Sequence, residues 1–166
     1  SSSNVDEVIK KRLLSKTDGA KQTLEIMYSN KESILKNIIS DNTVIICIGT
    51  DRAIGDALGP LVGTMLKNSD FKYPVYGTLD NPIHALNIYE SIEKIKSKHS
   101  SSQFLAIDAC LGSASNIGNI QIREGPILPG KGVGKKLPQV GTYSIVGIVD
   151  KIDENNSQSI PYPYPL

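Results

Sequence analysis

Two short and almost wholly apolar runs constrain the fold of this chain more than any other feature. The first spans residues 43–48 (TVIICI), and the second spans residues 103–108 (QFLAID) and ends in an acid. Neither run alternates apolar with polar residues, and the first is dominated by β-branched side chains. Such runs are typical of strands covered on both faces at the centre of a parallel sheet. The chain is therefore predicted to belong to the α/β class.

The segments around these runs indicate how the strands are connected. Apolar residues recur at helical spacing in residues 55–66 and 81–98, and a short strand is expected between them at 73–77. This alternation of strands and helices predicts a mostly parallel, twisted, doubly wound sheet with helices on both faces.

Local signals predict where several helices begin and end. Asn81-Pro82 is expected to start the helix over 81–98, because proline is favoured in the first turn of a helix. Asp18-Gly19 is expected to separate two N-terminal helices, at 5–16 and 20–39. Both would precede the first strand, so we expect them to pack across the sheet.

The C-terminal third of the chain has a different character. Residues 119–123 alternate apolar with polar side chains, as an edge strand does, and 143–149 form a last apolar strand. Residues 125–138 between them are rich in Gly, Pro and Lys and predict a long loop, a kind of segment that is often functional. We expect one α/β domain over 4–149, followed by an atypical proline-rich tail over 150–166.

Composition narrows the classes of function. The 166 residues include 18 basic and 17 acidic side chains, and this net charge of +1 does not point to nucleic acid or to a membrane surface. No apolar run approaches the ~20 residues that span a bilayer. Cys47 and Cys110 lie in apolar stretches, without metal or disulfide spacing, and are expected to be core residues of a cytoplasmic protein.

The stretch 48–60 (IGTDRAIGDALGP) contains the first candidate acid. A strand ends there, glycines allow a tight turn, and Asp56 lies near the start of the next helix. In open α/β sheets, ligands bind outside the carboxyl ends of the strands, so this position favours a functional role. The alternative is that Asp56 is an N-cap or a first-turn acid that the helix dipole stabilises. Asp51 has the same two interpretations, and its functional role would be to bind substrate.

Asp108 is the second candidate acid, because it closes the second apolar run. If both strands are adjacent and parallel, Asp56 and Asp108 are expected to meet in one crevice at the carboxyl edge of the sheet. Two close carboxylates repel each other as anions, so one pKa rises and the pair can share a proton. Such a pair could activate water for hydrolysis or bind a cation. The alternative is that Asp108 caps the loop 109–113 through backbone amides.

Two further residues are candidates for substrate binding. His84 is expected in the first turn of the helix after Asn81-Pro82, where it could reach the same edge or simply bond a backbone group. Lys131, in the predicted loop, could favour an anionic stretch of substrate or could be a solvated loop residue. Its surroundings, GPILPGKG, match part of a phosphate-binding loop, but two prolines remove backbone donors and no helix is predicted to follow.

Several blocks of the sequence together resemble a known family, the YyaC-type sporulation proteins of spore-forming bacteria. The resemblance covers roughly residues 43–149. The blocks are CIGTDRAIGDALGPLVGTML, VYGTLDNPIHALNIYE, FLAIDACLG, GNIQIREGPILPGKGVGKKLPQVG and YSIVGIV. That family is similar to the germination protease that degrades small acid-soluble spore proteins, and more distantly to the hydrogenase maturation endopeptidases. The resemblance implies a three-layer αβα sandwich of the phosphorylase/hydrolase-like type.

The resemblance also implies a function for the two acids. GDALGP presents Asp56, and IDAC presents Asp108, where the germination protease has its paired acids. In the hydrogenase maturation relatives the corresponding acids help to hold nickel with a later histidine, but Val140–Ile145 contains none here. We therefore expect an endopeptidase-like hydrolase without a metal or cofactor, acting on protein substrates such as small acid-soluble spore proteins in the spore or forespore. The alternatives are a non-catalytic binding protein of the spore and a metal-dependent hydrolase of a small molecule.

The C-terminal sequence departs from the pattern of the family. Beyond GIV the family continues into a further loop and a long helix, whereas this chain continues as KIDENNSQSIPYPYPL. We expect that ending to leave one face of the sheet partly uncovered. The consequence would be either reduced stability or a partner, including a second copy of the chain, that fills the gap.

Overall fold

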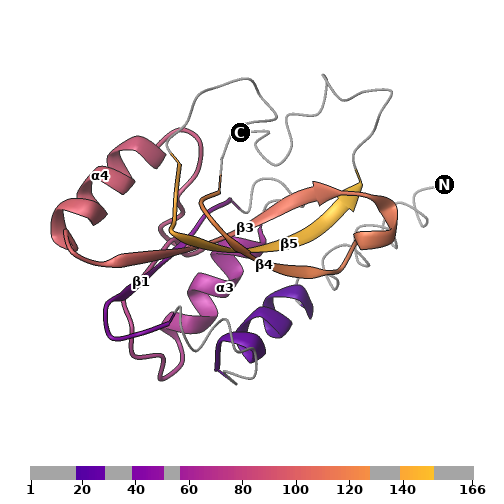
Figure 1. Ribbon diagram of the computed structural model, residues 1–166, viewed down its shortest axis with the longest axis horizontal. Helices are drawn as coiled ribbons and strands as arrows, with labels where there is room; N and C mark the ends of the chain where they lie inside the picture. The colour runs from indigo at the N-terminus through magenta and orange to yellow at the C-terminus, as the bar shows by residue number, and fades with distance from the viewer. Residues whose placement is uncertain (1–17, 29–38, 51–56, 128–138, 152–166) are drawn as a thin grey trace.

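The architecture is a mixed α/β arrangement around a five-stranded sheet (Figure 1). The computed structural model describes residues 18–28, 39–50, 57–127 and 139–151, and the statements below concern these residues. The strands are β1 (Thr43–Cys47), β2 (Val75–Tyr76), β3 (Gln103–Gly112), β4 (Ile120–Glu124) and β5 (Tyr143–Lys151). Their order across the sheet is β2-β1-β3-β5-β4. All neighbouring strands are parallel except β4, which is antiparallel to β5.

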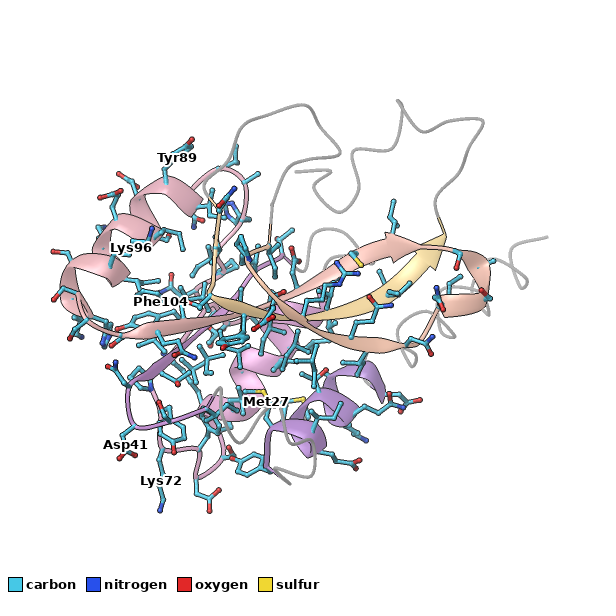
Figure 2. All side chains as sticks on the ribbon, in the orientation of Figure 1. Met27, Asp41, Lys72, Tyr89, Lys96 and Phe104 are labelled. Atoms are coloured by element: carbon cyan, nitrogen blue, oxygen red, sulfur yellow. The ribbon has the colours of Figure 1, made fainter. Side chains whose placement is uncertain are left out.

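The described helices lie on both faces of this sheet (Figure 1). One apolar cluster joins α3 (Leu58–Lys67) and a helix over residues 18–28 to the side chains of Ile45, Leu105 and Ile107. A second cluster joins α4 (Ile88–Lys98) to the side chains of the opposite face, among them Ile46 and Ala106. Figure 2 labels Met27 of the first cluster and Phe104 of the second. A short 3-10 helix, η2 (Ala114–Asn116), precedes β4.

The helix α3 packs unusually closely against the end of β1. A β-carbon on Gly59 would collide with the backbone oxygen of Ile48, and one on Gly63 would collide with the backbone oxygen of Gly77. Only glycine permits such a close approach of a helix to neighbouring backbone. The two glycines of the GPLVG segment therefore hold the first turns of α3 against the point where β1 ends.

Most of the predicted sheet is confirmed. The runs 43–48 and 103–108 form the adjacent central strands β1 and β3, and residues 120–124 form an edge strand as expected. The last strand, β5, extends to Lys151, so the sheet includes two residues that were assigned to the tail. The predicted loop is closed at its base by an antiparallel bridge between Ile127 and Val140.

Three predicted boundaries are wrong. Residues 18 and 19 are helical rather than a break, and the Thr23 hydroxyl donates a hydrogen bond to the Gly19 carbonyl oxygen within that helix (2.8 Å). The helix over 81–98 begins only at Ile88, because Ile83 forms a parallel bridge with Ile48 and is therefore extended. The strand β3 does not end at Asp108 but continues to Gly112, because β5 pairs with it over that length.

Other predictions fall outside the described residues. They are the helix over 5–16, the end of the second N-terminal helix at 29–38, and the tail beyond residue 151. Within the described residues, no helix combines the length and the apolar character needed to cross a membrane.

The close packing of α3 makes a testable prediction about stability. We expect Gly63→Ala to lower the free energy of unfolding by about 2 kcal/mol or more, because the added methyl group overpacks the contact with Gly77. Gly19→Ala is the matched control, since its β-carbon would be 3.5 Å from Leu58 and the residue is helical. That change should be neutral or stabilising by up to about 1 kcal/mol. Urea denaturation measures both, and equal effects would contradict the packing argument.

Candidate functional site

Asp108 lies where the central strand β1 ends. The ladder between β1 and β3 finishes at the pair Cys47 and Ile107, and the Ile48 amide donates to the Ile107 carbonyl oxygen (2.8 Å). Continuing this register places Ile48 beside Asp108. On its other side Asp108 pairs with Val146 of β5. Asp108 is thus inside β3 and yet at the carboxyl edge of β1, which reconciles the predicted edge position with the longer strand.

The side chain of Asp108 is buried and flanked by apolar neighbours. Its exposed fraction is 1%, and Ile48 and Val146 beside it are also buried. Because side chains alternate along a strand, Ala106, Asp108 and Cys110 share one face of β3. Ala106 belongs to the cluster that contains α4, so Asp108 is on the α4 face of the sheet.

One hydrogen bond of the Asp108 carboxylate is local. Its Oδ1 accepts a hydrogen bond from the Ala109 backbone amide at 2.8 Å. This hydrogen bond agrees in part with the alternative interpretation, in which Asp108 binds the backbone amides that follow it. Ala109, however, continues the strand and does not begin a loop. A carboxylate held in this way has a fixed orientation, which both a structural role and a catalytic role require.

Cys110 adds a second reactive group to this face of the sheet. Cys47 is buried as expected of a core residue, whereas Cys110 is only half-buried. Burial raises the pKa of the Cys110 thiol, the charge and hydrogen bond of Arg123 oppose that rise, and the charge of Asp108 adds to it. Arg123 also donates two hydrogen bonds to Gln121 Oε1, at 3.2 Å from Nε and 2.6 Å from Nη2. The alternation of IDAC along an extended strand could have identified this pairing of Asp108 with Cys110 from the sequence.

Cys47 belongs to the opposite face and has a different electrostatic environment. Its burial raises the pKa of the thiol strongly, and the nearby charge of Asp108 raises it further. The thiolate is the nucleophilic form of cysteine, so Cys47 is suited to packing and not to catalysis.

His84 lies in the loop before α4 and not in its first turn. The Asn87 side chain holds this loop, because its Oδ1 accepts from the His84 amide (2.8 Å) and its Nδ2 donates to the Pro82 carbonyl oxygen (2.9 Å). The His84 Nδ1 accepts a hydrogen bond from the Leu86 amide at 3.2 Å. Bonding a backbone group, one of its two predicted roles, is therefore at least part of what His84 does. The preceding residue, Ile83, bridges Ile48, which brings the loop to the carboxyl edge of β1.

Three of the predicted site residues, Asp51, Asp56 and Lys131, lie outside the described residues. Their neighbours are described. Thr50 and Ala57, at the two ends of the segment that contains Asp51 and Asp56, are both buried. The N-cap position of α3 is occupied by Ala57, which has no side-chain cap. The roles predicted for Asp51, Asp56 and Lys131 stay predictions.

The arrangement offers carboxylate and thiol chemistry, with an arginine at the margin of the site. Within the described residues, no group of three or more His, Cys, Asp or Glu side chains is placed to hold a metal ion. The described groups that share the face of Asp108 come from β3, β4 and β5, so they are held by the rigid sheet.

The chain belongs to the family described as "Protein of unknown function (DUF1256)", which matches residues 16–160. It is 44% identical over 143 residues to "Uncharacterized protein YyaC" of Bacillus subtilis (strain 168), with 84% of this chain and 68% of the relative covered. The resemblance to YyaC-type sequences is thereby confirmed. No solved structure matches the chain.

The contrasting environments of the two cysteines predict different reactivity. In the native protein we expect iodoacetamide to modify Cys110 at least about tenfold faster than Cys47. Cys47 is fully buried, and its burial and the charge of Asp108 both raise the pKa of its thiol. Arg123→Gln should move the pH midpoint of Cys110 alkylation upward, because the guanidinium that favours the thiolate is lost. Lys96→Gln on α4 is the control and should leave this midpoint unchanged. Peptide mass spectrometry follows each cysteine. An unchanged midpoint in Arg123→Gln would contradict the interaction between Arg123 and Cys110.

Proposed function

We propose that this protein is an endopeptidase-like hydrolase associated with sporulation or germination, which cuts a protein substrate with Asp56 and Asp108. In this proposal the fold is a three-layer αβα sandwich of the phosphorylase/hydrolase-like class, and the protein works in the cytoplasm of the spore or forespore. The observation that carries the proposal is the buried carboxyl of Asp108 at the point where β1 ends.

The connectivity of the chain supports a pair of acids at this point. Gly59 packs on the backbone of Ile48, and Ile48 is the neighbour of Asp108 across the β1–β3 ladder. Asp56 precedes Gly59 by three residues, so chain length alone keeps their Cα atoms within about 11 Å of each other. Asp108 therefore lies at the edge where open α/β sheets hold their sites, and in the sequence Asp56 comes shortly before the glycine that packs on Ile48.

The proposed chemistry is hydrolysis by a water molecule between the two carboxyl groups. One carboxylate removes a proton from the water as its oxygen attacks the scissile carbonyl carbon, and the other, protonated, donates a hydrogen bond to the carbonyl oxygen. Collapse of the tetrahedral intermediate breaks the C–N bond, and the departing nitrogen receives the proton that the first carboxylate took from the water. The products are a carboxylate and an amine. No metal is required, in keeping with the lack of histidine over Val140–Ile145.

A second candidate is a non-catalytic binding protein that keeps the site around Asp108 for recognition. The hydrogen bond from the Ala109 amide to Asp108 Oδ1 favours it, because it gives the buried acid a structural role that needs no substrate. In that case the protein would bind small acid-soluble spore proteins and leave them intact.

Conservative substitutions separate these two functions. We expect Asp108→Asn and Asp56→Asn each to reduce cleavage of small acid-soluble spore proteins by about 10²–10⁴-fold, the usual contribution of a general acid or base. Asparagine keeps an oxygen that can accept the Ala109 hydrogen bond, so the fold should persist. Gel analysis after incubation across acid to neutral pH measures the cleavage.

The matched control for this experiment is Asp80→Asn, since Asp80 is an exposed loop residue. It should cleave like the unmodified protein. Undiminished turnover in either Asp108→Asn or Asp56→Asn would defeat the paired mechanism. Binding without cleavage by the unmodified protein at every pH would favour the recognition function instead.

A further inference from the structure

The strand β2 forms one open edge of the sheet among the described residues. It pairs with β1 on one side only, and the order β2-β1-β3-β5-β4 places no described strand beyond it. The Ile45 amide donates to the Pro74 carbonyl oxygen (2.9 Å), so residues 74 and 76 direct their backbone groups toward β1. By the alternation of a strand, the N–H and C=O of Val75 are directed outward. Such an edge is a template on which another strand can pair.

A hollow flanks this edge on each face of the sheet. The first, of about 400 Å³, is lined by side chains at the C-terminal end of α3 and the segment before β2, including Lys67, Phe71 and Tyr73. The second, of about 360 Å³, lies between β2 and α4 and includes Ile83, Lys94 and Ile95. Both hollows also contain Tyr76 and Lys98, so they meet at the edge.

Tyr76 forms a fixed wall between the two hollows. Its hydroxyl is hydrogen-bonded to His99 Nε2 at 2.7 Å, and the two rings pack edge to face with centroids 5.6 Å apart. The Val75 side chain lies in the cluster of α3 and the Tyr76 side chain packs with the cluster of α4. The edge therefore presents ordered side chains on both faces.

The charged side chains that line the hollows are mainly lysines, among apolar, aromatic and neutral polar neighbours. Lys67 and Lys98 line the first hollow without an acidic side chain, and Lys94 and Lys98 line the second together with Glu90. An extended peptide that adds to an edge strand places alternate side chains on opposite faces of the sheet. The hollows would receive these side chains, and the charge favours acidic side chains toward Lys67.

We infer that the β2 edge is a docking site for an extended acidic segment of another protein, which pairs with Val75 as an added strand. Acidic side chains on one face of that segment enter the first hollow, and aliphatic or polar side chains on the other face enter the second. This inference is independent of the proposed hydrolase, since it depends on the backbone of Val75 and on the lysines of α3 and α4, and not on the carboxyl group of Asp108.

The lysines have a competing explanation, which the same experiment tests. Short edge strands and edge lysines protect natural sheets from pairing with other chains. Lysines that prevent the edge from pairing with unsuitable strands can still allow it to bind an acidic strand. They repel a cationic strand and attract an anionic one. If the lysines serve protection alone, an acidic strand would find no preferred register or site.

The test uses a capped, fluorescein-labelled ten-residue peptide of alternating threonine and glutamate with the full chain. We expect saturable binding by fluorescence anisotropy, and slower amide hydrogen exchange at Val75 and Gly77 in the complex. Lys98→Glu should weaken binding by about tenfold or more. The matched control is Lys96→Glu, on the same helix and lining neither hollow (labelled in Figure 2), which should stay within about twofold.

Two further peptides make the result specific. A threonine–lysine peptide should not bind the unmodified protein but should bind the double variant Lys67→Glu/Lys98→Glu. Two versions of the threonine–glutamate peptide carry methyl groups on alternate backbone nitrogens, one on the odd and one on the even positions. The version that lacks the N–H groups facing Val75 should not bind, and the other should bind. The inference is overturned if the acidic peptide does not bind, if Lys96→Glu weakens it as much as Lys98→Glu, or if exchange at Val75 is unchanged.

Discussion

The contact between α3 and the end of β1 is the constraint on which the rest of the structure depends. Gly59 and Gly63 let the helix meet the backbone at Ile48 and Gly77, where any larger residue would collide. This contact fixes Gly59, which comes three residues after Asp56 in the sequence, against Ile48. Because β3 lies directly beside β1, the contact also holds the start of α3 at the edge where Asp108 lies. The proposed chemistry therefore depends on the packing of two glycines.

Much of this centre could be predicted from the sequence because its signals are local. The continuous apolar runs over 43–48 and 103–108 identify buried parallel strands, and both were found at the centre of the sheet. An acid directly after apolar strand residues indicates the carboxyl edge, and Asp108 does lie beside the end of β1. The close approach of α3 was not predicted, since the glycines of GPLVG could equally serve a turn.

What the sequence did not reveal depends on contacts between distant segments. The extension of β3 beyond Asp108 comes from its pairing with β5, whose register no local pattern encodes. The late start of α4 comes from the bridge between Ile83 and Ile48 and from the Asn87 side chain, which binds the loop before the helix. The hydrogen bond between Cys110 and Arg123 likewise joins β3 and β4, which do not pair with each other but each pair with β5.

The central claim is that Asp56 and Asp108 act as one coupled pair. Carbon-13 NMR of aspartate carboxyl groups measures this coupling directly, when the titration of Asp108 is followed in the unmodified protein and in Asp56→Asn. Interacting acids titrate together, so the account predicts that the midpoint of Asp108 moves by about one pH unit or more when Asp56 loses its charge. Superimposable titration curves in the two proteins would contradict the pair.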